Sequence, residues 1–142
     1  MTEYTLFLGL FILAYLLNAG SKTYLILLLA ESINYYFHGY YLEYSAVDTA
    51  GIDLIVLIAL ATFGDIHKKY QISLLAAAIF VHLLFEWDNT FGTYLITNEY
   101  ESLFHYNFGY AITIGQLLGA GYGVLERIRF PDTNSSLFSD RN

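Results

Sequence analysis

The chain has 142 residues, of which 56% are hydrophobic, 18% aromatic and only 13% charged, and its formal net charge is −7. A soluble domain usually carries about 25% charged residues, and so short a chain has too much surface to keep this much apolar side chain from water. We therefore predict an integral membrane protein, and the acidic charge argues against nucleic-acid binding, which needs a basic surface.

Five apolar stretches approach the length that crosses a bilayer, about 20 residues. In chain order they cover residues 4–19, 23–42, 46–64, 70–87 and 108–126. The first lacks the positively charged start of a signal peptide, so we expect it to be a retained span. The connections between the first four are short, which favours antiparallel neighbours. The prediction is an all-α fold, a single polytopic transmembrane bundle of about five spans over residues 1–130.

Two segments fall outside these spans. Residues 88–107 are rich in aromatic side chains, and we expect an outer interfacial loop with a short helix capped by Asn98. Pro131 follows the last span and cannot continue a helix, so residues 131–142 are expected to form a flexible cytoplasmic tail.

The basic residues sort to one side of a five-span bundle. They are Lys22, Lys68, Lys69, Arg127, Arg129 and Arg141. Because basic residues mark the cytoplasmic side, the N-terminus is predicted outside and the C-terminus inside. This pattern favours a bacterial-type inner membrane, and the small size also fits a viral membrane.

Small residues recur every fourth position in the last stretch, at Ala111, Gly115, Gly119 and Gly123. Such residues lie above one another on a helix face and let a second helix approach closely. The partner is either a neighbouring span, for which Ala76–Ala78 offer a surface, or a second copy of the chain in a homo-oligomer.

Ionisable residues within the stretches are the candidate functional groups, because each is costly in lipid unless paired or hydrated. They are Glu31, His38, Asp53, His82 and Glu86. Glu31 is expected near mid-membrane, whereas the other four are expected to converge at similar depth in the outer half.

Three interpretations of these residues remain open. They form a buried hydrogen-bond network, a proton or cation pathway, or a metal site for zinc, iron, copper or manganese.

The leading functional prediction is a non-enzymatic subunit of a membrane assembly, namely a pore, a channel or an accessory or scaffold component, with holin-like and virion-membrane proteins as examples of this format. Its partners would be the lipid bilayer and either further copies or other membrane subunits. The alternative is an accessory or catalytic subunit of a metalloenzyme or a proton-coupled complex. The chain is expected to be too small to enclose a substrate cavity alone.

Overall fold

The computed structural model contains five α-helices and, within the described residues, no strand, so the all-α prediction is confirmed. The backbone is described for residues 2–18, 20–40, 46–91 and 98–130, and the side chains for residues 3–18, 20–36, 49–88, 91 and 107–130. The helices are α1 (Thr2–Leu17), α2 (Lys22–Tyr40), α3 (Ala46–Phe63), α4 (Lys68–Phe91) and α5 (Asn98–Arg129).

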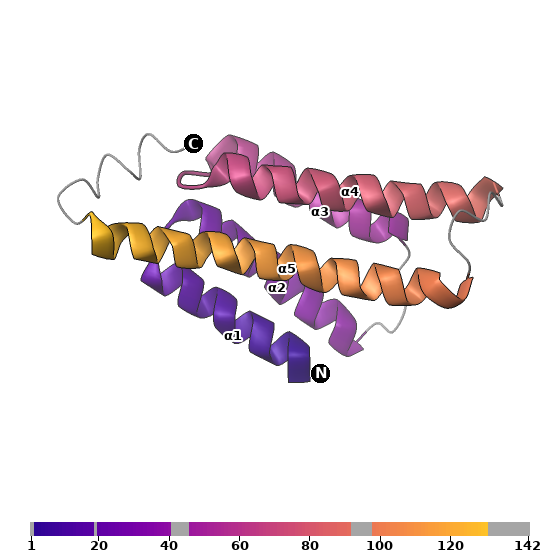
Figure 1. Cartoon of the computed structure of the whole chain (residues 1–142), viewed down its shortest axis with the longest axis horizontal. Helices are drawn as coiled ribbons and strands as arrows, with labels where there is room; N and C mark the ends of the chain where they lie inside the picture. Colours follow the sequence, from indigo (N-terminus) through magenta and orange to yellow (C-terminus); the bar gives the residue numbers. More distant parts are fainter. Residues whose placement is uncertain (1, 19, 41–45, 92–97, 131–142) are drawn as a thin grey trace.

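The five helices form a ring. Helices that follow one another in sequence pack together and run antiparallel, and contacts between the parallel helices α1 and α5 close the ring (Figure 1). One end of the ring, which we call the basic end, holds the α1–α2 turn, the α3–α4 turn and the end of α5. The opposite end, which we call the acidic end, holds the starts of α1, α3 and α5.

The basic residues of the helices follow this division. The basic end carries Lys22, Lys68, Lys69, Arg127 and Arg129, whereas Arg141 lies outside the described residues. The first turn of α1 and the last turns of α4 bring the acidic residues Glu3, Glu86 and Asp88 to the other end. The sorting of charge that the sequence predicts is therefore present in the fold.

The region between the fourth and fifth spans differs from the prediction. Helix α4 continues to Phe91, and α5 begins at Asn98 and runs without a break for 32 residues. Residues 98–107, expected as a separate interfacial piece, are the first turns of α5. The physical reason is that no proline lies between Asn98 and Arg129, so nothing in the sequence forces this helix to stop. The predicted tail, residues 131–142, lies outside the described residues.

Two helical segments are long and apolar enough to cross a membrane. They are Lys68–Asp88 and Asn107–Arg129, and two shorter apolar segments are Glu3–Leu17 and Thr49–Phe63. Length and composition alone therefore support two spans, and the count of five is taken up below as a proposal.

The surface of the bundle is apolar, and its interior combines a hydrophobic core with an unusual number of polar side chains. All five helices expose large apolar side chains, among them Leu6, Ile33, Ile55, Phe80 and Leu118. In contrast, the buried set includes many polar residues, namely Asn18, Ser21, Thr23, Glu31, Gln71, His82, Asp88, Gln116 and Glu126.

Candidate functional site

A cavity of about 400 Å³ lies inside the ring, and all five helices contribute to its wall. This differs from the expectation that the chain is too small to enclose one. The cavity is lined by Tyr4, Phe7, Leu27, Ala30, Glu31, Asn34, Thr49, Ile52, Asp53, Val56, Leu75, Ala78, His82, Phe108, Gly109, Tyr110, Ile112, Thr113 and Gln116. Since the lining includes the early turns of α1, α3 and α5, the cavity lies in the half of the bundle nearer the acidic end.

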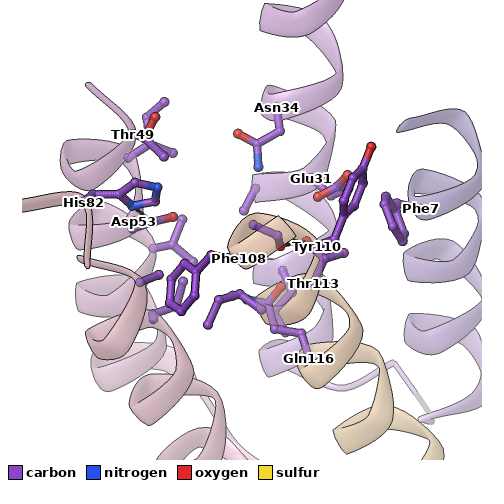
Figure 2. A pocket seen from close by; sticks show the side chains of 18 of the residues that line it. Phe7, Glu31, Asn34, Thr49, Asp53, His82, Phe108, Tyr110, Thr113 and Gln116 are labelled. Carbon is purple, nitrogen blue, oxygen red and sulfur yellow. Dashed lines mark hydrogen bonds and ion pairs between the residues drawn. The ribbon is translucent and has the colours of Figure 1, made fainter. Parts of the chain in front are cut away.

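Three of the five predicted ionisable residues line this cavity. Asp53 of α3 and His82 of α4 face each other on neighbouring antiparallel helices, with 3.5 Å between Asp53 Oδ2 and His82 Nδ1. That distance is longer than an ordinary hydrogen bond, so the pair is an electrostatic contact. Glu31 of α2 lies on the opposite side of the cavity (Figure 2) and is 7% exposed.

The other two predicted residues are not part of the described wall. Glu86 lies one turn beyond His82 on α4 but does not line the cavity, and it is half-buried. The side chain of His38 lies outside the described residues. The expected convergence of four groups in the outer half is thus reduced to the Asp53–His82 pair, with Glu31 across from it.

The described residues do not assemble a metal site. No group of three or more His, Asp or Glu side chains lies close enough together to hold an ion, in the parts of the chain that the structure describes. The Asp53–His82 pair supplies only two ligands, fewer than the three protein ligands of a typical zinc site.

Aromatic side chains from the first turns of α1 and the early part of α5 complete the cavity wall. Phe7 and Tyr110 have ring centroids 5.5 Å apart, and the Tyr110 hydroxyl donates to Glu3 Oε1 at 3.3 Å. Tyr4 and Phe108 also line the cavity. The sequence predicts that Tyr4 and Phe7 lie in the first span and Phe108 and Tyr110 in the fifth, but it does not predict that these two spans face each other, so the role of the four rings in the wall was missed.

A packed layer separates the cavity from the basic end. Tyr24, Leu27, Leu60 and Gln71 are at most 2% exposed. Gln71 Nε2 donates to the Gln116 carbonyl oxygen at 3.1 Å and to the Tyr24 hydroxyl at 3.4 Å. The Tyr24 hydroxyl in turn lies 2.9 Å from His67 Nδ1. These contacts join α2, α4 and α5 between the cavity and the basic end, and the layer closes the cavity toward the basic end.

The basic end is held together by the carboxylate of Asp65, which caps helix α2 from the α3–α4 turn. It accepts hydrogen bonds from the backbone N–H groups of Lys22 (3.0 Å) and Thr23 (3.1 Å), and from the hydroxyls of Ser21 (2.5 Å) and Thr23 (3.0 Å). Burial alone would raise the pKa of Asp65, but the hydrogen bonds from Ser21, Lys22, Thr23 and Ile66 outweigh it and lower the pKa below 3.8. The carboxylate is therefore charged at neutral pH and compensates the positive N-terminus of α2.

The glycine ladder packs within the chain. A Cβ on Gly115 would lie 3.3 Å from Leu74 Cδ1, and one on Gly119 would lie 2.7 Å from Tyr70 Cε1, so both glycines face the first turns of α4. Gly123 is equally close to Asn18 and His67, while Ala111 is exposed. The helix partner is α4, a neighbouring helix of the same chain, which was one of the two predicted alternatives. The glycines contact Tyr70 and Leu74 of α4 rather than Ala76–Ala78.

Searches against protein-family models, curated proteins and solved structures find no match. The described lining contains two carboxylates, one imidazole, several amides and hydroxyls, and no lysine or arginine. Such a wall can bind a proton or a cation.

Proposed function

We propose that the chain is an integral membrane protein of five spans, with the acidic end outside and the basic end in the cytoplasm. The exposed apolar side chains on all five helices support this, because soluble monomers rarely expose large apolar surfaces. The two longest apolar segments are only 28% and 22% buried, whereas the core helix of a soluble protein would be mostly covered. The basic residues of the helices lie at one end, as the positive-inside rule requires. This polarity favours a bacterial-type inner membrane, or a viral membrane derived from one.

The shorter helices are compatible with spanning. Helix α1 has 16 residues, which corresponds to about 24 Å at 1.5 Å per residue, against a hydrocarbon thickness of about 30 Å. A short span is accommodated by local thinning of the bilayer at modest cost.

Within the membrane, the proposed role is that of a non-enzymatic component that takes up a proton or a cation from the outer side. The observation that carries this proposal is the cavity lined by Glu31 and the Asp53–His82 pair. This cavity lies toward the acidic end, and packed side chains separate it from the basic end. This arrangement fits a binding site better than a permanently open pore through one chain. A metalloenzyme is not proposed, because the described residues offer no set of three ligands. The glycine ladder no longer favours a homo-oligomer, since its partner is α4.

The orientation is tested by labelling introduced cysteines, which is straightforward because the chain has none of its own. Asn107→Cys lies on the acidic side and Lys69→Cys at the basic end, and both wild-type side chains are exposed. In intact cells an impermeant maleimide should label only the first, and both after permeabilisation. Equal labelling of both in intact cells, or release of the protein from membranes by alkaline carbonate, would contradict the proposal.

The charge of the cavity is tested with small cationic and anionic methanethiosulfonates of similar size. At Thr113→Cys, on the cavity wall, the cationic reagent should react faster than the anionic one, and Glu31→Gln should reduce this preference. Ala120→Cys, which replaces a residue that is 3% exposed outside the cavity lining, should react slowly with both. Equal rates for the two reagents at Thr113→Cys would refute a cation-selective cavity.

A further inference from the structure

We propose that the cavity binds an organic ammonium ion, with Glu31 opposite its charge and the aromatic side chains of α1 and α5 against its carbon substituents. This inference rests on the cation-binding role proposed above and specifies the chemical class of the ligand.

The charges in the wall exclude an anion and favour a cation. Glu31 is 7% exposed, and the side chain of Asp53 is 18% exposed. His82 is the only described group in the lining that can become positive, and it contacts Asp53 rather than Glu31. Asn34 provides a hydrogen bond to the Glu31 carboxyl group, but an amide does not neutralise a carboxylate. A buried charge is costly unless it is paired, so a cation beside Glu31 would be stabilised.

The size of the cavity and the spread of its charges favour a bulky cation over a bare metal ion. A metal ion needs several ligand atoms at about 2.0–2.6 Å, whereas Glu31 and Asp53 lie on opposite sides of the cavity (Figure 2). A volume of about 400 Å³ falls within the range of small-molecule sites. A ligand that fills this space while carrying one charge satisfies both observations.

The aromatic rings provide the surface that such a ligand prefers. Phe7 and Tyr110 lie near Glu31 on one side of the cavity (Figure 2), and their rings contact each other. Tyr4 and Phe108 add two further rings to the wall. Aromatic faces attract alkylammonium groups through their quadrupole, and sites for quaternary ammonium ligands are typically built from several rings.

The test compares choline with 3,3-dimethylbutan-1-ol, which has the same shape without the charge. Binding is measured by isothermal titration calorimetry at neutral pH, on the full chain in nanodiscs of phosphatidylglycerol. Choline should bind at least about tenfold more tightly than the alcohol, which corresponds to about 1.4 kcal/mol. Equal affinities would show that the cavity recognises shape alone and would overturn the proposal, as would the absence of choline binding up to millimolar concentrations.

Matched variants locate the site. Glu31→Gln should weaken choline binding about tenfold or more and leave the alcohol unaffected, and Phe7→Leu should weaken choline binding severalfold. Glu86→Gln removes a carboxyl group from the same half of the bundle but outside the lining, so choline affinity should not change. An equal effect of the two carboxyl substitutions would indicate a diffuse electrostatic attraction and would refute the site. Circular dichroism of each variant verifies that it is folded.

The source of the ammonium group is resolved by changing the lipid. If the group belongs to a lipid headgroup, the apparent affinity for free choline should fall in phosphatidylcholine nanodiscs. If it belongs to a free solute, the affinity should be the same in both lipids. Since both faces of a nanodisc are open to solvent, this result does not depend on the orientation tested by cysteine labelling. A cationic preference at Thr113→Cys without choline binding would refute the ammonium ligand alone, whereas loss of that preference would refute the cation-binding role itself.

Discussion

The cap that Asp65 provides for helix α2 leads to the most quantitative prediction, that Asp65→Ala destabilises the fold strongly. The carboxylate accepts hydrogen bonds from two N–H groups of the first turn of α2, those of Lys22 and Thr23. Removing a helix cap typically costs about 1 kcal/mol, with a range of about 0.5–2 kcal/mol. The substitution also removes the acceptor of the Thr23 hydroxyl, which is fully buried, and an unsatisfied buried donor costs about 1–3 kcal/mol. The expected loss in the free energy of unfolding is the sum of the two, about 1.5–5 kcal/mol.

A matched variant separates the charge of the cap from its hydrogen bonds. Asp65→Asn keeps one side-chain oxygen for Thr23 but loses the charge and places an amide N–H₂ group near the N–H of Lys22. It should therefore cost less, about 1–2 kcal/mol. Lys69→Ala changes an exposed residue at the same end of the bundle and should stay within about 0.5 kcal/mol of the wild type.

The assay is reversible unfolding by sodium dodecyl sulfate in mixed micelles, followed by circular dichroism. Because the pKa of Asp65 in the folded protein is lowered below 3.8, its contribution is complete at pH values above the ordinary value and declines as the pH falls toward the folded value. The difference between the wild type and Asp65→Asn should be constant from about pH 5 to 8 and shrink below about pH 4. An Asp65→Ala variant as stable as Lys69→Ala, or a difference that does not depend on pH, would refute the reasoning.

Two further predictions use the same assay. Gly119→Ala should destabilise the protein by about 1–3 kcal/mol, because its Cβ would lie 2.7 Å from a ring carbon of Tyr70. The control is Gly121→Ala, whose Cβ would meet nothing within 4 Å and which should be neutral or stabilising by up to about 1 kcal/mol. Equal effects of the two substitutions would mean that α5 packs differently. For the Asp53–His82 contact of 3.5 Å, a double-mutant cycle with both residues changed to Ala should give a coupling of about 0.5–2 kcal/mol, and a coupling within error of zero would show that the two side chains do not interact.

The helices were predictable because their apolar stretches are long and bounded by turn-forming residues. The turn between α1 and α2 illustrates this: Gly20 has φ +70°, a conformation that glycine adopts without strain, and its N–H donates to the Tyr15 carbonyl oxygen. The beginning of α5 was not predicted as continuous, because the aromatic and acidic composition of residues 98–107 hides a helix that contains no breaking residue. Composition describes the environment of a segment, and it does not by itself show whether the backbone continues as a helix.

Which of the predicted residues line the cavity depends on the rotation of each helix about its own axis. Local sequence does not encode this rotation. His82 and Glu86 are one turn apart on α4, yet only His82 lines the cavity. A spacing of four residues on a helix of 3.6 residues per turn leaves an offset of about 40°, enough to move a side chain from the cavity to the boundary with the neighbouring helix. The position of a residue along its helix was therefore inferable from the sequence, and its orientation toward the cavity was not.

Closure of the ring explains why the chain encloses a cavity despite its size. Four helices that pack in sequence would leave α1 and α4 as open edges, and side chains such as Phe7 would lie on the outer surface of the bundle. Contacts between α1 and α5 close this gap and bring Phe7 against Tyr110. At the basic end, glycines at 119 and 123 let α5 approach α4 and the two turns closely. At the acidic end α5 carries large residues, Phe108 and Tyr110, in the corresponding turns, and the cavity lies there. The same helix thus closes the ring tightly at one end and leaves space at the other.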